Sequence, residues 1–142
     1  MLVSQILKTK GDLVFTVAPT EAVSAVAGLL HARRVGALVV LEAEQVVGIV
    51  SERDLVRALA EDGPGALGVP VARYMTRDVL FADPGATVDE LLEKMTDRRI
   101  RHLPVCRNER LVGLISIGDL VKAKISEVEA EADGLKAYIA AG

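Results

Sequence analysis

The sequence predicts an α+β fold made of two copies of one β-α-β-β-α unit. Residues 12–61 align with residues 77–126 without a gap, and 15 of the 50 aligned positions are identical. Within each copy, short apolar runs typical of strands alternate with helical apolar spacing. The chain of 142 residues is 51% hydrophobic but only 3% aromatic, so aliphatic side chains must form the core. Because each copy is small, we expect the copies to pack on each other.

The elements of the first copy follow in order along the chain. Residues 14–17 form a short β-rich run, and the apolar spacing over residues 22–30 suits a helix. Two apolar runs, residues 36–41 and 46–50, are joined by a short polar turn and predict an antiparallel hairpin. Residues 51–59 then begin a second helix.

The second copy repeats this order, and the chain then continues beyond it. Thr87 with Glu90 three residues later predicts a capping box at the start of a helix. The last helix is expected to run past the repeat and to be interrupted or loosened near Gly134. A Gly- and Pro-rich stretch separates the copies and indicates a linker. The predicted division is residues 1–63 and 71–126 for the two units, 64–70 for the linker and 127–142 for a C-terminal helical extension.

Composition and charge argue against several classes of protein. A net charge of −3 and a pI of about 5.4 disfavour general nucleic-acid binding. We expect no membrane partner and a cytoplasmic location, because no apolar run is long enough to span a bilayer and the N-terminus lacks a leader pattern. The single cysteine, Cys106, excludes an internal disulfide and is expected to lie in a buried strand. Without a recognisable catalytic or phosphate-loop motif, the sequence predicts no enzyme, catalytic cofactor or metal site.

Two seven-residue motifs, Gly48 to Asp54 and Gly113 to Asp119, carry a family resemblance. Each contains Gly, two apolar residues, Ser, two variable residues and Asp, and each follows an apolar strand and opens a helix. This pattern resembles the signature of the cystathionine-β-synthase (CBS) domain family, and the resemblance extends over about residues 3–126. Tyr74-Met75-Thr76 and the strand at residues 101–105 match two further phrases of that family. It implies two units packed sheet to sheet about a pseudo-two-fold axis, with adenosine nucleotides bound in the clefts between them.

The resemblance also implies a set of ligand-binding residues. Asp54 and Asp119 are expected to accept hydrogen bonds from the ribose hydroxyls, and helix N-termini suit a phosphate. Contacts to phosphate or ribose are expected from Ser51, Ser116, Arg53, Arg101 and His102, with the last three converging on phosphate. An aliphatic adenine pocket is expected from Thr16, Val17, Ala18, Gly36, Ala37, Leu38, Phe81, Ala82, Leu103 and Pro104.

The same residues also have a purely structural interpretation. Ser followed three residues later by Asp is a capping box, so both motifs could serve only to start a helix. The pairs Arg33-Arg34 and Arg98-Arg99 recur in both copies and favour a solvated or helix C-terminal role. His31 has no partner at metal-ligand spacing and is interpreted as structural.

We therefore predict a stand-alone regulatory CBS pair, or Bateman module. It is expected to bind AMP or ATP, to signal energy or metabolic state to an unidentified partner protein, and to form the homodimeric disc common in the family. NAD(H) and S-adenosylmethionine are alternative ligands. Two rival classes stay open: a ligand-free oligomerisation module, and an enzyme that hydrolyses a nucleotide with help from His102.

Overall fold

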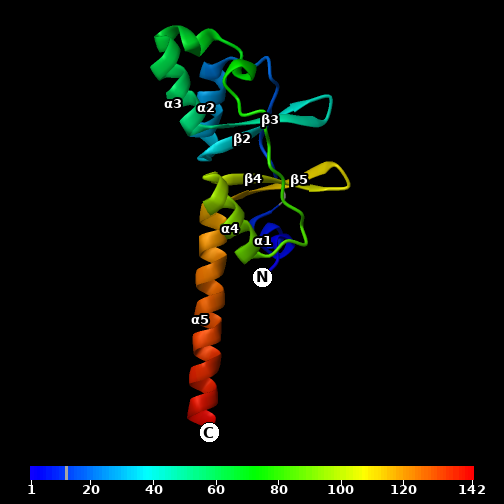
Figure 1. Cartoon of the computed structure of the whole chain (residues 1–142), viewed down its shortest axis with the longest axis vertical. Coiled ribbons are helices and arrows are strands. Elements are labelled where there is room, and N and C mark those ends of the chain that lie inside the picture. The colour runs from blue at the N-terminus through cyan, green and yellow to red at the C-terminus, as the bar shows by residue number, and fades with distance from the viewer. Residues whose placement is uncertain (12) are drawn as a thin grey trace. The chain divides into compact units, whose positions relative to one another are not determined.

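The computed structural model describes residues 1–11 and 13–142, which form two compact units (Figure 1). The first, which we call the central unit, contains Leu13–Leu80. The second, the terminal unit, combines the N-terminal residues as far as Gly11 with Phe81–Gly142. Each unit mixes helices with a small sheet, which confirms the predicted fold class.

The central unit is built on a three-stranded sheet. Strand β1 (Thr16–Val17) pairs in parallel with β2 (Ala37–Glu42), and β2 pairs antiparallel with β3 (Gln45–Ser51). Helices α2 (Val23–Arg33) and α3 (Glu52–Asp62) lie along one side of the β2–β3 hairpin (Figure 1). These elements occur in the order that apolar periodicity predicts for the first copy.

The stretch predicted to be a linker is packed into the central unit. It forms most of a 3-10 helix, η1 (Gly63–Gly68), and leads into a second, η2 (Val71–Arg73). Ala66 and Val71 are fully buried in the core of this unit. The backbone N–H of Val23 donates to the carbonyl of Val69. Residues of the expected linker therefore contribute to the core.

The terminal unit has a two-stranded sheet with three helices. Strands β4 (His102–Arg107) and β5 (Arg110–Ser116) form an antiparallel hairpin. Helices α1 (Val3–Lys10), α4 (Val88–Arg98) and the first turns of α5 (Ile117–Ala141) lie along one side of it (Figure 1). The capping box predicted from Thr87 and Glu90 is present at the start of α4.

The compact units do not follow the boundaries of the sequence repeat. The segment that leads into the first copy packs in the terminal unit, and the segment that leads into the second copy packs in the central unit. The buried side chains that anchor them are Val3, Ile6 and Leu7 in α1, and Val71, Tyr74 and Met75 in and after η2. The ranges predicted from the repeat differ from the compact units because buried contacts, not sequence similarity, define the latter.

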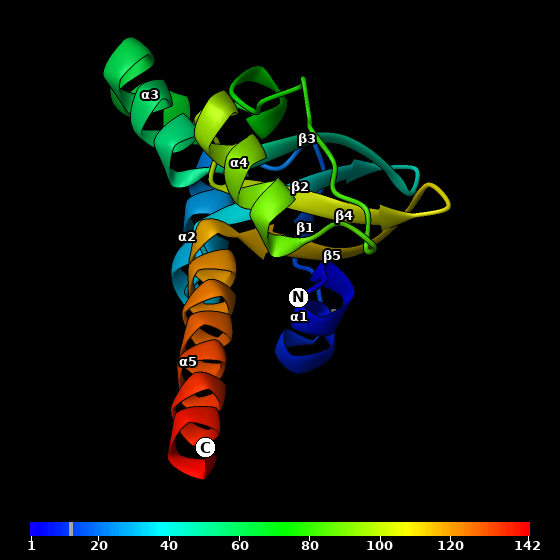
Figure 2. The same ribbon diagram turned by 60° about the horizontal axis from the view of Figure 1, so that its bottom comes forward.

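Helix α5 continues for 25 residues. The interruption predicted near Gly134 is therefore wrong, because one glycine costs only about 1 kcal/mol in a helix otherwise rich in good helix formers. In both views the C-terminal half of α5 stands clear of the rest of its unit (Figures 1 and 2). Across residues 1–11 and 13–142, no helix is both long and apolar enough to cross a membrane.

Repeated arginines mark two helix ends. Arg34 and Arg99 follow α2 and α4 as C-caps in the left-handed conformation, at φ 54° and 53°. This confirms the helix C-terminal position predicted for the two arginine pairs. Cys106 lies in β4, as expected, but is only partly buried; this burial raises the pKa of its thiol.

Candidate functional site

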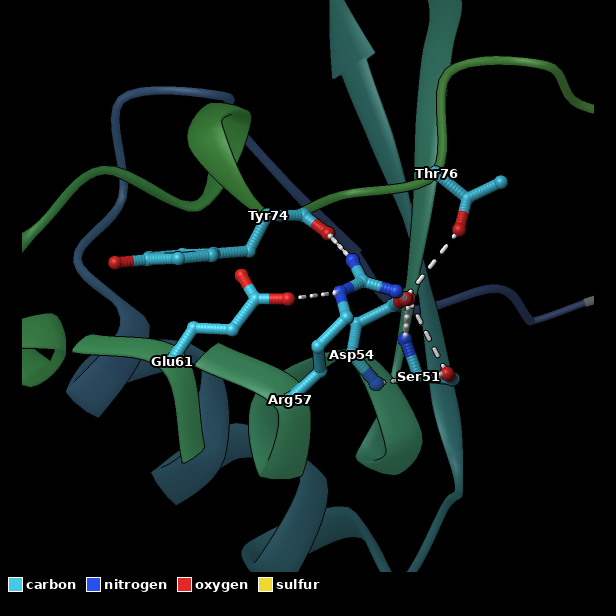
Figure 3. A network of polar contacts seen from close by, with 6 residues as sticks. All are labelled: Ser51, Asp54, Arg57, Glu61, Tyr74 and Thr76. Carbon is cyan, nitrogen blue, oxygen red and sulfur yellow. Dashed lines mark hydrogen bonds and ion pairs between the residues drawn. The ribbon is translucent and has the colours of Figure 1, made fainter. Parts of the chain in front are cut away.

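The first motif places Ser51 and Asp54 at the N-terminus of α3 (Figure 3). The backbone N–H of Ser51 donates to Asp54 Oδ2 at 2.9 Å, and the N–H of Asp54 donates to Ser51 Oγ at 3.4 Å. Each side chain thus satisfies a backbone donor that the helix leaves without an intrahelical partner. The capping role considered for this motif is present in the structure.

The other carboxylate oxygen of Asp54 binds two further side chains (Figure 3). Arg57 Nη1 lies 3.2 Å from Oδ1, and the Thr76 hydroxyl donates to Oδ1 at 3.4 Å. Arg57 also donates to the carbonyl of Tyr74 at 2.8 Å, so it ties α3 to the segment after η2. Asp54 is only 5% exposed, and its acceptor capacity is largely used by the protein. A ribose that bound Asp54 would have to displace some of these donors.

The second motif repeats the cap but has a different cation beside it. Ser116 N–H donates to Asp119 Oδ2 at 2.9 Å, and Asp119 N–H donates to Ser116 Oγ at 3.1 Å. Lys10 Nζ, from α1, lies 2.6 Å from Asp119 Oδ2 and 2.8 Å from the carbonyl oxygen of Leu114. Partial burial raises the pKa of Asp119, but the hydrogen bonds from Lys10 and Ser116 outweigh it, so the pKa lies below its ordinary value.

The two motifs are therefore chemically unequal. In the central unit, Thr76 exchanges two backbone hydrogen bonds with Ile49 and points its hydroxyl at Asp54. In the terminal unit, Lys10 donates to Leu114, the repeat equivalent of Ile49, and to the repeat equivalent of Asp54. The segment docked beside each motif thus brings a hydroxyl in one unit and an ammonium in the other.

The motif glycines allow these docked segments to approach closely. A Cβ on Gly48 would lie 2.6 Å from Met75 Sδ and 3.0 Å from the carbonyl oxygen of Thr76. A Cβ on Gly113 would lie 2.5 Å from Leu7 Cδ2. Both distances to the side-chain atoms are too short for a real contact, so glycine is required at this point of each strand unless the neighbour moves.

The other first-copy residues divide between two open hollows. Thr16, Val17 and Ala18 line one of about 360 Å³ beside α2, whereas Gly36 lines another of about 580 Å³. Ala37 and Leu38 are buried in β2, and Leu38 belongs to the core of the central unit. The exposed side chain of Arg53 lies in the first turn of α3.

The second-copy residues lie around β4 in the terminal unit. Arg101 is exposed just before the strand, and its carbonyl accepts the N–H of Ile117 at 2.8 Å. His102 is partly buried and pairs in register with Ser116. This register brings Arg101 and His102 next to the capped start of α5.

Most of the residues expected to line the adenine pocket in this unit are buried in its core or engaged in backbone hydrogen bonds. Leu103 is fully buried, and the N–H of Ala82 donates to the carbonyl of Pro104 at 2.9 Å. Ala82 is itself buried, whereas Phe81 is 40% exposed. Of these residues, Phe81 therefore presents the most accessible side chain.

Sequence reasoning missed three side chains that bind the motif carboxylates. Arg57 is one helical turn beyond Asp54, a spacing that could have indicated the ion pair. Thr76 and Lys10 carry no such signal, since they reach their carboxylates from positions 22 and 109 residues away.

Residues 5–61 and 71–126 each match the family model of the CBS domain, and the chain therefore belongs to the CBS domain family. This confirms that the repeat is a tandem of CBS domains. Solved structures of CBS pairs share the fold. The CBS-domain containing protein ATU1752 from Agrobacterium tumefaciens has a TM-score of 0.86 at 46% identity, with 87% of this chain and 99% of that chain covered.

Two further relatives extend the comparison. A mitochondrial CBS domain-containing protein of Arabidopsis thaliana, CBSX3, is 37% identical over 113 residues, or 76% of this chain; the match spans only 55% of that relative's length. The CBS domain pair of protein MJ0100, crystallised with 5′-methylthioadenosine and S-adenosyl-L-methionine, has a TM-score of 0.77 at 25% identity and covers 87% of this chain and 98% of that one. At least one similar CBS pair thus binds adenosine-containing ligands.

Proposed function

We propose that this chain is a regulatory module that binds an adenosine-containing nucleotide, AMP or ATP, and catalyses no reaction on it. The observation that carries the proposal is the strand-to-helix junction with its Gly, Ser and Asp, which occurs once in each unit. The adenosine ligands of the MJ0100 pair support the ligand class. Binding alters the surface offered to a partner protein, because a ligand shifts any equilibrium between states that it binds unequally.

The phosphate is assigned to the cations near these junctions. Arg53 is exposed on the first turn of α3, where the positive end of the helix dipole already favours an anion. Arg101 is the exposed cation of the terminal unit that precedes the start of α5. Contacts of Arg53, Arg101 and His102 with the phosphates of one nucleotide or of two adjacent nucleotides are part of the proposal, as are the homodimer and the cytoplasmic location. NAD(H) and S-adenosylmethionine are the alternative ligands.

Calorimetry with AMP and adenosine tests the phosphate assignment. Arg53→Ala and Arg101→Ala should each weaken AMP binding by about tenfold, the effect of losing one charge-assisted hydrogen bond. Adenosine binding should change less than about twofold, since that ligand has no phosphate. Arg110→Ala, an exposed arginine at the start of β5, is the matched control and should bind like the wild type. Equal losses for AMP and adenosine would refute the assignment.

The ribose role of the motif aspartates needs a control for helix capping. Asp54→Ala and Asp119→Ala should lower both the melting temperature and the affinity for adenosine. Glu90→Ala removes the third residue of another capping box, at α4, and should lower the melting temperature alone. If all three variants lose stability and none loses affinity, the aspartates only cap helices. If the wild type binds none of AMP, ATP, NAD or S-adenosylmethionine, the ligand-free module is the better description.

A further inference from the structure

An apolar stripe follows the exposed side of α5 along most of its length. Its residues are spaced alternately by four and three positions, which is the a/d pattern of a coiled coil. Five of the six are large hydrophobic side chains between 45% and 67% exposed. The stripe consists of Val121, Ile125, Val128, Ala132, Leu135 and Ile139.

The opposite side of α5 makes the contacts with its own unit. Leu120 and Ala123 are buried, and Lys124 forms an ion pair with Asp89 of α4 at 2.9 Å. Glu127 binds the N-terminal ammonium. Beyond this turn the helix stands clear of its unit in both views (Figures 1 and 2). The stripe therefore lies on the side of α5 that its own unit leaves exposed.

The charges that flank the stripe select the orientation of a second helix. In a parallel, in-register pair, residues at g face residues at e of the next heptad. Lys124 would then face Glu129 of the other copy, and Glu131 would face Lys136. Both pairs have opposite charges. The second pair is the clearer one, because Lys124 already contacts Asp89.

An antiparallel pair centred on the same stripe brings like charges together. Lys122 would lie opposite Lys136 of the other copy. Glu129 would face Glu129 of the other copy, and Glu131 would face Glu131. Like charges across a helix pair destabilise it. The flanking charges therefore fit a second copy of this chain in the parallel orientation.

We propose that α5 forms a parallel two-stranded coiled coil with α5 of a second copy of this chain. In this register Ile125, Ala132 and Ile139 occupy a positions, and Val121, Val128 and Leu135 occupy d positions. Only the C-terminal pair, Leu135 at d and Ile139 at a, has the arrangement that favours two strands. The stripe covers about 27 Å of helix, so the coil is short, and a reversible, concentration-dependent dimer is expected. The interface requires no ligand, and it does not depend on the proposed nucleotide binding.

Sedimentation equilibrium of the full-length chain, from micromolar to hundred-micromolar concentration, tests the interface. The wild type should dimerise with rising concentration, whereas the double variant Leu135→Asp and Ile139→Asp should need at least tenfold more protein to reach the same fraction of dimer, even if a second interface also forms. Ala137→Asp adds a carboxylate to the opposite side of the same exposed turns and should dimerise like the wild type. A wild type that stays monomeric, or a double variant that dimerises as strongly as the wild type, would overturn the proposal.

A charge swap tests the orientation. Glu131→Lys should weaken the dimer at least several-fold, because two cations then meet in the parallel pair, and adding Lys136→Glu should restore it. In an antiparallel pair, residue 131 faces residue 131 of the other copy, so Glu131→Lys would replace a Glu–Glu pair with a Lys–Lys pair and leave the repulsion in place. Unchanged dimerisation in the single variant, or no recovery in the double variant, would contradict the parallel coil.

Discussion

Lys10 and Asp119 lie 109 positions apart in the chain, yet their side chains form a close ion pair in the terminal unit. The pair contributes to stability as long as Asp119 is ionised. Because the pKa of Asp119 is lower in the folded than in the unfolded state, this contribution is complete above the unfolded pKa, near 4. It is lost as the pH falls through the lower, folded pKa.

Lys10→Met should therefore destabilise the protein at pH 7 by no more than about 1 kcal/mol, since both side chains are partly exposed and screened by solvent. The difference from wild type should shrink below pH 4. Urea unfolding at pH 7 and pH 3 measures both effects. Lys8→Met removes a cation from the same helix and should show no comparable pH dependence. A Lys10→Met deficit that is equal at both pH values would contradict the role of the ion pair.

Gly48 and Gly134 predict opposite effects for the same substitution. A methyl group at Gly48 would collide with Met75 and with the backbone of Thr76, so Gly48→Ala should cost about 1–3 kcal/mol of unfolding free energy. Gly134 lies in α5 with nothing within 4 Å of the added carbon, and Gly134→Ala should add about 0.5–1 kcal/mol to helix stability. Thermal unfolding of both variants checks the sign. A stable Gly48→Ala protein would show that Met75 can move aside at little cost.

At the scale of elements, the turns of the two β-hairpins both contain non-glycine residues with positive φ. Ala43 and Glu44 both have positive φ, at 49° and 64°, as do Asn108 and Glu109, at 51° and 65°. Two such residues in succession match a type I′ turn, which suits the twist of a hairpin. The sequence places both turns correctly, but only Asn108 belongs to the residue types that favour this conformation.

Glu44→Gly and Glu109→Gly should each stabilise the protein by about 0.5–1 kcal/mol, because glycine adopts positive φ without the Cβ penalty. Glu42→Gly changes a β2 residue next to the turn and should destabilise instead. Melting temperatures of the three variants compare the effects directly. If all three lower the melting temperature, side-chain contacts of the turn glutamates outweigh the backbone strain.

At the scale of the whole molecule, each compact unit contains a leading segment from the other copy. Ile6 is buried in the terminal unit and Val71 in the core of the central unit, although each precedes the copy that it does not pack with. Replacing either side chain by that of alanine should therefore destabilise the hairpin of the unit in which that side chain is buried.

Hydrogen exchange measured by mass spectrometry tests which unit each leading segment stabilises. Ile6→Ala should speed exchange in β4 and β5, whereas Val71→Ala should speed it in β2 and β3, each with a local loss of about 2–4 kcal/mol. The two variants act as each other's control. Faster exchange in β2 and β3 for Ile6→Ala would contradict the assignment of α1 to the terminal unit.

Local features were largely predictable. The hairpins, the start of α2 and the capping box at Thr87 follow from apolar periodicity and from residues three positions apart, so a short stretch of chain contains the needed information. The Ser51–Asp54 cap was foreseen for the same reason. The interruption predicted at Gly134 was wrong because helix propensity is a weak preference, and the other residues of the 25-residue helix override it.

The sequence by itself determined the repeat, the order of strands and helices, the family and the caps of the two motifs, because these depend on neighbours in the chain. Only the tertiary structure decided which segment completes each unit, and with it that Thr76 binds Asp54 while Lys10 binds Asp119. The physical reason is that buried area and ion pairing act between side chains close in space. Two copies with the same local pattern could therefore acquire different chemistry from the segments that dock on them.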